Sequence, residues 1–213
     1  RLGNWLKQDI SMNMKKGFTV WFTGCPFSGK KQLAGMLAAE LESQGWQIEF
    51  LDGGKIRREY EKGLGYSKKD VTQNIKRIAF ECRMLTETGA AVIAVTISPY
   101  KAQREKARAE IGRFIEVYCH APMKLLKKRD TKGLYAAAEK GECADVAGIS
   151  APYEIPDKPE VDFDSGTESF ESGLSKLMNT LQVLGYVEGS GDHILTREEE
   201  ELIRKRLQDL GYI

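Results

Sequence analysis

Apolar residues along the chain fall into two kinds of segment, short continuous runs and longer stretches with helical spacing. The short runs are strand-length and largely apolar, and several are rich in β-branched and aromatic residues, which predicts buried strands. Five strands are expected, at residues 18–23, 47–51, 90–97, 114–119 and 160–164. Strands this apolar are typical of a parallel sheet that is covered on both faces.

Between these runs, apolar residues recur every three or four positions, which predicts amphipathic helices. The helices are expected at 33–41, 67–89 and 101–111, after Pro122, and at 170–184. Ser165 and Glu168 have the spacing of a capping box for the last of these. The alternation of strands and helices predicts an α/β fold with a mostly parallel five-stranded sheet and helices on both faces.

Residues 130–159 interrupt this alternation. The segment has few aliphatic residues, three glycines and three prolines. We interpret it as a mobile lid loop, because it lacks the apolar residues that a second domain would need for its own core. The domain itself is expected to span residues 17–187, after an N-terminal extension at 1–16.

The remaining residues, 188–213, follow a Gly-Ser-Gly break and predict a C-terminal amphipathic helix. Thr196 and Glu199 form a capping-box pattern, and Gly211 has the position of a C-cap. The apolar stripe of this helix consists of Leu202, Ile203, Leu207 and Leu210. Two interpretations stay open: the helix packs on its own domain, or it docks to a partner or a sister subunit.

Composition narrows the classes of function. The 213 residues include 32 Lys and Arg against 31 Asp and Glu, so the net charge is +1, without the excess positive charge of a general nucleic-acid binder. Hydrophobic residues make up 41%, yet no apolar run approaches the roughly 20 residues that span a bilayer. The chain starts at Arg1 with no signal peptide and no initiator Met, which favours a fragment or a processed chain.

Four scattered cysteines and two histidines lack the spacing of a zinc site. The cysteines are Cys25, Cys82, Cys119 and Cys143, and the histidines are His120 and His193. Cysteines without pairing motifs are typical of reduced thiols in a cytoplasmic protein, so we expect a cytoplasmic location.

Residues 24–30, Gly-Cys-Pro-Phe-Ser-Gly-Lys, match the pattern GxxxxGK between a predicted strand and a predicted helix. In this pattern a tight turn directs backbone N–H groups at phosphate oxygens, and the lysine and the helix N-terminus add positive charge. We call residues 24–30 the phosphate loop. The candidate ATP-binding residues are Gly24, Cys25, Pro26, Phe27, Ser28, Gly29, Lys30 and Lys31.

Two features of the phosphate loop are unusual. Lys31 stands where a Ser or Thr hydroxyl ordinarily binds Mg²⁺, and Gln32 follows it, so one metal ligand is missing. Phe27 is bulky for a loop that wraps phosphate closely. For Cys25 two interpretations stay open: a thiol whose pKa is depressed by the surrounding N–H dipoles, or a small residue that is merely tolerated there.

Six further blocks accompany the phosphate loop in order. They lie at residues 51–57, 64–67, 74–77, 97–100, 132–135 and 151–154. With these blocks the chain resembles the adenylylsulfate kinase family over about residues 17–184. The resemblance implies a three-layer P-loop kinase fold, with ATP and Mg²⁺ as cofactors. It also implies transfer of the γ-phosphoryl group of ATP to the 3′-hydroxyl of adenylyl sulfate, which gives 3′-phosphoadenylyl sulfate.

The resemblance also implies roles for individual residues. The expected catalytic residues are Lys30, Asp52 and Ser98, with Asp52 also a weak metal ligand. The expected acceptor-binding residues are Arg57, Tyr66, Asn74, Ser98, Lys132 and Leu134. As partners it implies a second copy in a homodimer and a fused or associated ATP sulfurylase, with no nucleic acid and no membrane.

The chain departs from the family pattern at the metal and the acceptor. Gly54 and Lys55 replace an acid and an amide, Val71 replaces an arginine, and Val146 replaces a lid aromatic. Three hypotheses therefore stay open: an active adenylylsulfate kinase, a nucleotide-binding regulatory module without turnover, and a kinase for a related nucleotide acceptor.

Overall fold

The computed structural model of the chain describes residues 16–60, 63–188, 197–209 and 211. Its centre is one five-stranded sheet in the order β2-β3-β1-β4-β5, and all four pairings are parallel. The predicted five-stranded parallel sheet is therefore confirmed, with strand ends that agree to within two residues. The strands are β1 (Phe18–Thr23), β2 (Ile48–Asp52), β3 (Ala91–Val95), β4 (Phe114–His120) and β5 (Val161–Asp164).

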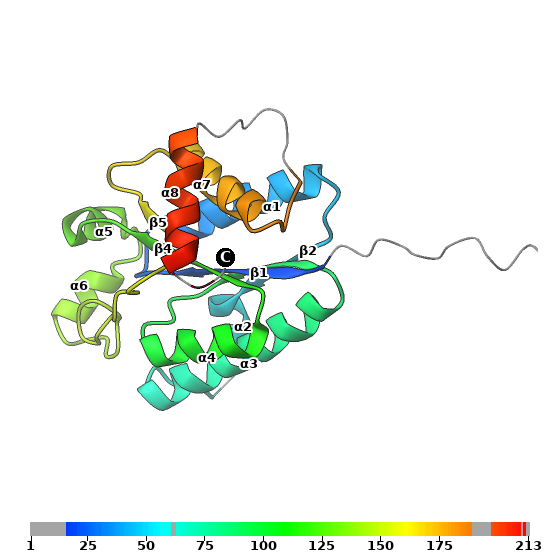
Figure 1. Ribbon diagram of the computed structural model, residues 1–213. Coiled ribbons are helices and arrows are strands. Elements are labelled where there is room, and N and C mark those ends of the chain that lie inside the picture. The colour runs from blue at the N-terminus through cyan, green and yellow to red at the C-terminus, as the bar shows by residue number, and fades with distance from the viewer. Residues whose placement is uncertain (1–15, 61–62, 189–196, 210, 212–213) are drawn as a thin grey trace, which may run out of the picture.

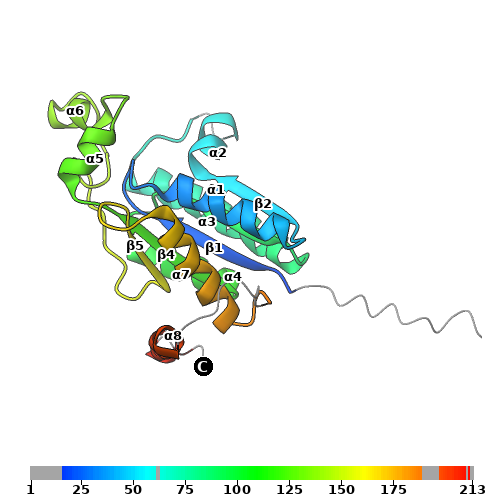
Figure 2. The ribbon, with the colours of Figure 1, turned by 90° about the horizontal axis from the view of Figure 1, so that it is seen from above.

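Helices cover both faces of the sheet. They are α1 (Lys30–Ser43), α2 (Gly53–Tyr60), α3 (Lys68–Glu87), α4 (Lys101–Ile111), α5 (Met123–Arg129), α6 (Leu134–Glu139), α7 (Phe170–Val183) and α8 (Arg197–Asp209). Helices α1 and α7 lie on one face, and α3 and α4 lie on the other (Figure 1). Figure 2 shows α5 and α6 projecting beyond one end of the sheet, with α8 outside α7.

The central strand β1 is buried on both sides and divides the core. Because successive side chains of a strand point to opposite faces, alternate residues join different clusters. Phe18, Val20 and Phe22 pack with the buried leucines of α1 and α7. Trp21 packs with Ile78 and the other apolar residues of α3 and α4. This burial fixes the carboxyl end of β1, where the phosphate loop begins.

Residues 130–159 were expected to form a loop, and this prediction is wrong for one part of them. Residues 134–139 form α6, and Tyr135 of this helix is only 1% exposed. Tyr135 and Val146 share a small apolar cluster with Leu126 of α5. Three consecutive alanines after Tyr135 favour the helix, a signal that the glycines and prolines nearby had obscured.

Helix α7 starts at Phe170 as expected, but its N-cap differs from the expectation. Ser169 is the N-cap, and its hydroxyl accepts a hydrogen bond from the N–H of Ser172 at 3.1 Å. The predicted cap, Ser165, is engaged elsewhere: its hydroxyl donates to the carbonyl oxygen of His120 at 3.0 Å. Glu168 accepts from the N–H of Asp164 instead of completing a box with Ser165.

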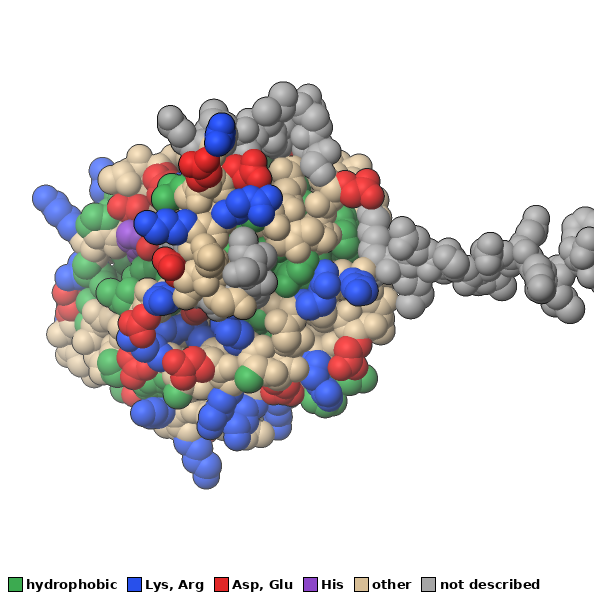
Figure 3. All heavy atoms as spheres, viewed as in Figure 1, with side chains coloured by type: hydrophobic (Ala, Val, Ile, Leu, Met, Phe, Trp, Pro, Cys, Tyr) green, Lys and Arg blue, Asp and Glu red, His purple; other side chains and the backbone are tan. Residues whose placement is uncertain are grey.

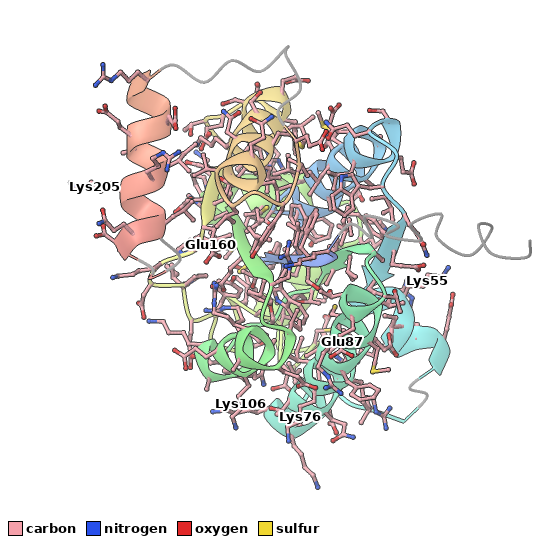
Figure 4. The ribbon with its side chains drawn as sticks, turned by 45° about the vertical axis from the view of Figure 1, so that its right-hand side comes forward. Lys55, Lys76, Glu87, Lys106, Glu160 and Lys205 are labelled. Carbon is pink, nitrogen blue, oxygen red and sulfur yellow. The ribbon has the colours of Figure 1, made fainter. Side chains whose placement is uncertain are left out.

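The C-terminal helix is present as α8, which contacts α7. Leu207 is buried, whereas Leu202 is 71% exposed, so only part of the apolar stripe packs on the domain. Lys205 points away from the body of the molecule (Figure 4). The predicted cap Thr196 and the last stripe residue Leu210 lie outside the described residues, while Gly211 has the positive φ of a C-cap, 78°.

Buried charges join α4 to the sheet. The carboxylate of Glu160 is fully buried and accepts two hydrogen bonds from the guanidinium of Arg108, at 2.7 and 2.9 Å. The same carboxylate accepts from the backbone N–H of Glu116 at 2.6 Å. Beside this network, basic side chains gather in a hollow below α8 (Figure 3), which Arg104 and Lys101 also line. The network fixes α4 against β4.

We predict that Glu160→Ala lowers the free energy of unfolding by about 3 kcal/mol, because it leaves a guanidinium and a buried N–H without their carboxylate. Urea denaturation followed by circular dichroism measures this loss. The control is Glu110→Ala on the exposed side of α4, which we expect to change stability by less than about 0.5 kcal/mol. Equal effects of the two substitutions would contradict a stabilising role for the network.

Candidate active site

The candidate site lies at the carboxyl edge of the sheet. In parallel α/β sheets this edge holds ligands, because strands end there and helices begin. The phosphate loop follows β1, Asp52 ends β2, and Ser98 follows β3. Since β1, β3 and β2 are neighbours, the fold brings these three segments together, as the sequence predicted.

Two glycines of the phosphate loop are required by its shape. Gly24 has a φ of 145°, and a Cβ there would lie 2.1 Å from the carbonyl oxygen of Cys119 on β4. Gly29 has a φ of 84°, and a Cβ there would meet the ring of Phe170 at 3.0 Å. Neither position has room for a side chain. Glycine at both positions therefore allows the chain to turn tightly from β1 into α1.

The turn leaves hydrogen-bond donors free at the start of α1. Among the described residues, the N–H groups of Gly29, Lys30 and Lys31 have no partner. The hydroxyl of Ser28 is also fully buried and has no hydrogen-bond partner within the described ranges. Buried polar groups ordinarily have partners, and unpaired N–H groups at a helix N-terminus bind anions. This arrangement can bind the phosphates of a nucleotide.

Lys30 closes over the loop. Its ammonium donates a hydrogen bond to the carbonyl oxygen of Cys25 at 2.8 Å. Burial lowers the pKa of Lys30 to about 8, although the nearby Cys119, Cys25 and Asp52 partly oppose the shift. A phosphate oxygen in the loop would favour the charged form of Lys30. The ammonium of Lys30 can therefore exchange its hydrogen bond to the neutral carbonyl oxygen of Cys25 for one to a charged phosphate oxygen.

Phe27 and Cys25 line the side of the loop that faces α6. Phe27 has a φ of 62°, an uncommon conformation for a bulky residue, and its ring meets that of Tyr135 edge to face at 5.7 Å between centroids. Burial raises the pKa of the Cys25 thiol, with Lys30 acting in the opposite direction. The alternative of a depressed thiol pKa is therefore wrong, and the small, tolerated residue remains.

Asp52 and Lys31 form an ion pair beside the loop. The ammonium of Lys31 lies 2.8 Å from Oδ2 of Asp52, while Oδ1 accepts from the N–H groups of Gly54 and Lys55 at 3.0 and 3.1 Å. Burial alone would raise the pKa of Asp52, but these hydrogen bonds outweigh it and hold the pKa below its usual value. Asp52 is therefore charged and also caps α2, a helix that the sequence analysis missed.

The residues of the site do not fit Mg²⁺. This ion prefers several oxygen ligands in octahedral geometry. Lys31 occupies the position of the usual hydroxyl, and both oxygens of Asp52 already accept hydrogen bonds. Gly54 offers no side chain, and the described residues contain no group of three or more His, Cys, Asp or Glu that could hold a metal ion. We derive no step through a protein-bound magnesium.

The expected acceptor-binding residues are only partly brought together. The guanidinium of Arg57 stacks on the ring of Tyr66, 3.8 Å from its centroid, and that ring is 62% exposed. Asn74 on α3 is buried, and its Oδ1 has no partner among the described residues. Lys132 is exposed just before α6, which Leu134 begins, and no contact within the described part of the chain joins either residue to Arg57.

Ser98 lies beneath the site. Its side chain is buried, accepts a hydrogen bond from Nε1 of Trp21 at 3.1 Å, and donates to the hydroxyl of Thr23 at 2.9 Å. Thr23 in turn shares a hydrogen bond of 2.8 Å with the hydroxyl of Tyr153. Ser98 therefore joins the ends of β1 and β3.

Sequence reasoning missed two residues that hold the phosphate loop. Arg129 at the end of α5 bonds both the hydroxyl and the carbonyl oxygen of Ser165, each at 2.7 Å, and reaches the carbonyl oxygen of Phe27 at 3.5 Å. The hydroxyl of Tyr135 donates to the carbonyl oxygen of Pro26 at 2.8 Å. Tyr135 belongs to one of the recognised blocks, but its contact spans 109 positions and no local pattern reveals it.

Comparison with known proteins places this site in a family. The family model described as adenylylsulphate kinase matches residues 16–164. The chain belongs to the adenylylsulphate kinase family. It is 43% identical over 173 residues to an adenylyl-sulfate kinase of Microcystis aeruginosa, covering 81% of this chain and 96% of that one.

Two further members show how the chain relates to longer and to solved proteins. A probable bifunctional SAT/APS kinase 2 of Sorangium cellulosum is 45% identical over 175 residues, 82% of this chain but only 30% of that protein. The structure of a Mycobacterium tuberculosis APS kinase in complex with AMPPNP and APS superposes with a TM-score of 0.73 at 33% identity. It covers 78% of this chain and 98% of the other. The predicted family, P-loop kinase fold and phosphotransferase class are confirmed.

Two further findings concern the cysteines and the helices. All four cysteines are free thiols. Within the described ranges, no helix is both long enough and apolar enough to cross a bilayer.

We predict that ADP binding weakens as the pH rises through about 8, the pKa of Lys30. Below this pH the ammonium is charged and attracts phosphate, whereas above it the free protein must first bind a proton. The dissociation constant should therefore rise about tenfold between pH 7 and pH 9. Isothermal titration calorimetry measures it. Lys30→Arg, which stays charged, should abolish the dependence; an unchanged dependence in this variant would contradict the assignment to Lys30.

Proposed function

We propose that the chain transfers the γ-phosphoryl group of ATP to the 3′-hydroxyl of adenylyl sulfate. The observation that carries this proposal is the unpartnered set of N–H groups at Gly29, Lys30 and Lys31, with Lys30 above it. This geometry suits the polyphosphate of a nucleotide. The acceptor is supported by the Mycobacterium tuberculosis family member, whose structure contains both AMPPNP and APS.

Phosphoryl transfer depends mainly on positioning and on stabilising charge, so each residue has a limited task. Lys30 and the loop N–H groups hold the phosphates of ATP. Asp52 orients the acceptor hydroxyl by accepting its hydrogen bond, because a carboxyl with a lowered pKa is a weak base. Ser98 is a positioning residue that holds the strand ends beneath the reacting groups.

The acceptor nucleotide is proposed to bind at the Arg57–Tyr66 stack. The exposed ring of Tyr66 offers a face for adenine, and the guanidinium of Arg57 suits the sulfate–phosphate anhydride. Asn74 supplies an unpaired amide oxygen for a hydroxyl or an amino group. Lys132 and Leu134 approach the acceptor from the start of α6 and the residues just before it, which requires this part of the chain to move toward Tyr66.

In this reaction magnesium arrives with ATP as part of the substrate, held by phosphate oxygens and water. The free thiols support a cytoplasmic location, and the expected homodimer stays a proposal. Association with ATP sulfurylase is supported by the bifunctional relative from Sorangium cellulosum, of which this chain spans 30%.

A nucleotide-binding module without turnover is a second candidate. The ion pair between Lys31 and Asp52 favours it, since it engages the carboxylate that would face the acceptor hydroxyl. The two candidates share the nucleotide site and differ only in turnover.

A coupled assay of ADP release, with Mg–ATP and adenylyl sulfate, separates them. We expect turnover above about 0.1 s⁻¹, somewhat below the common range for enzymes. Lys30→Met should lower it by about 10²–10³, because one charge-stabilising contact is lost. The matched control is Lys106→Met on the outer side of α4 (Figure 4), which should leave the rate unchanged. Tight binding of 3′-phosphoadenylyl sulfate without turnover would establish the regulatory module instead.

Replacing adenylyl sulfate by AMP in the same assay tests the acceptor. We expect at least tenfold slower turnover with AMP, because Arg57 then loses the sulfate group. Faster turnover with AMP would assign the chain to a related acceptor.

A further inference from the structure

We propose that Lys31 takes the place of a protein-bound divalent metal ion in nucleotide binding, so that ADP and ATP bind without requiring one. This inference rests on the proposed nucleotide site and goes beyond it, because it concerns how the charge of the phosphates is neutralised. It starts from the disagreement described above: the family's reaction implies Mg²⁺, yet the residues present do not fit it.

Lys31 lies where the metal-binding hydroxyl is ordinarily found. It is the second residue of α1, its N–H is one of the unpartnered donors, and its side chain runs to Asp52 across the carboxyl edge of the sheet. The Nζ–Oδ2 distance of 2.8 Å joins the two segments between which a metal ion would sit. The ammonium therefore occupies the gap between phosphate loop and carboxylate.

The ammonium of Lys31 also has hydrogen-bond donors that the contact with Asp52 does not use. It carries three N–H groups, and the hydrogen bond to Asp52 uses one. The Lys31 side chain is 73% exposed, whereas that of Asp52 is 21% exposed, so the remaining donors face solvent at the mouth of the loop. A cation held on one side by a carboxylate and open on the other can contact phosphate oxygens, as a bridging metal ion does.

Asp52 in turn is unsuited to bind a metal while this pair persists. Its Oδ1 is committed to the N–H groups of Gly54 and Lys55, and its Oδ2 to Lys31. A divalent ion at Asp52 would have to displace the ammonium and would be repelled by it. The neighbouring Lys55 does not share this role, because only its backbone N–H contacts Asp52 and its exposed side chain is on α2 (Figure 4).

Isothermal titration calorimetry with ADP, in EDTA and in excess Mg²⁺, tests the proposal. For the unaltered chain we expect dissociation constants that agree within threefold in the two buffers. Lys31→Ser restores a hydroxyl and frees Asp52, so its affinity should fall at least tenfold in EDTA and recover in Mg²⁺. The matched control Lys55→Ser, which removes a neighbouring positive charge, should change neither constant by more than threefold.

The outcomes separate this inference from the proposed function. If the dissociation constant of the unaltered chain for ADP is more than tenfold higher in EDTA than in Mg²⁺, the inference is overturned and the kinase function stays intact. Absence of binding in both buffers would overturn both. Lys31 is mostly exposed, so Lys31→Ser should melt within a few degrees of the unaltered chain; equal affinity of this variant in EDTA and Mg²⁺ would also overturn the inference.

Discussion

The site depends on the turn from β1 into α1, which leaves three N–H groups at the helix start without partners in the part of the chain that the structure describes. Close packing fixes this turn: Gly24 lies against the carbonyl oxygen of Cys119, and Gly29 lies against the ring of Phe170. Arg129 and Tyr135 hold the carbonyl groups of the loop from outside, which directs its N–H groups inward. Unpaired donors are costly in a folded protein, and bound phosphate removes that cost.

Charge around this turn is supplied by side chains of the protein. Burial lowers the pKa of Lys30 to about 8 before phosphate arrives, and Lys31 is held by a carboxylate at the mouth of the loop. An exposed ion pair of this kind stabilises the folded protein by at most about 1 kcal/mol. The pair can therefore adjust readily, so that Lys31 contacts phosphate while it stays beside Asp52, and Oδ2 of Asp52 also accepts from an acceptor hydroxyl.

The sequence predicted what is encoded locally. Strands β1, β3 and β4 are largely apolar runs, and the loop glycines lie at fixed spacing, so the sheet and the phosphate loop were recognisable. The Lys31–Asp52 ion pair was not recognisable, because its residues are 21 positions apart and meet only through the order of the strands in the sheet. The N-cap of α7 was misplaced because distant partners, His120 and Arg129, engage the hydroxyl of Ser165. Helix α2 was missed because its cap, Asp52, had been assigned to the site alone.

A crystal structure of the chain with ADP, grown in the presence of EDTA, tests the central claim most directly. The account predicts that the β-phosphate lies within hydrogen-bond distance of the N–H groups of Gly29, Lys30 and Lys31, with the ammonium of Lys31 between phosphate and Asp52. A phosphate loop left empty, or one filled only after Mg²⁺ is added and bound to Asp52, would contradict it.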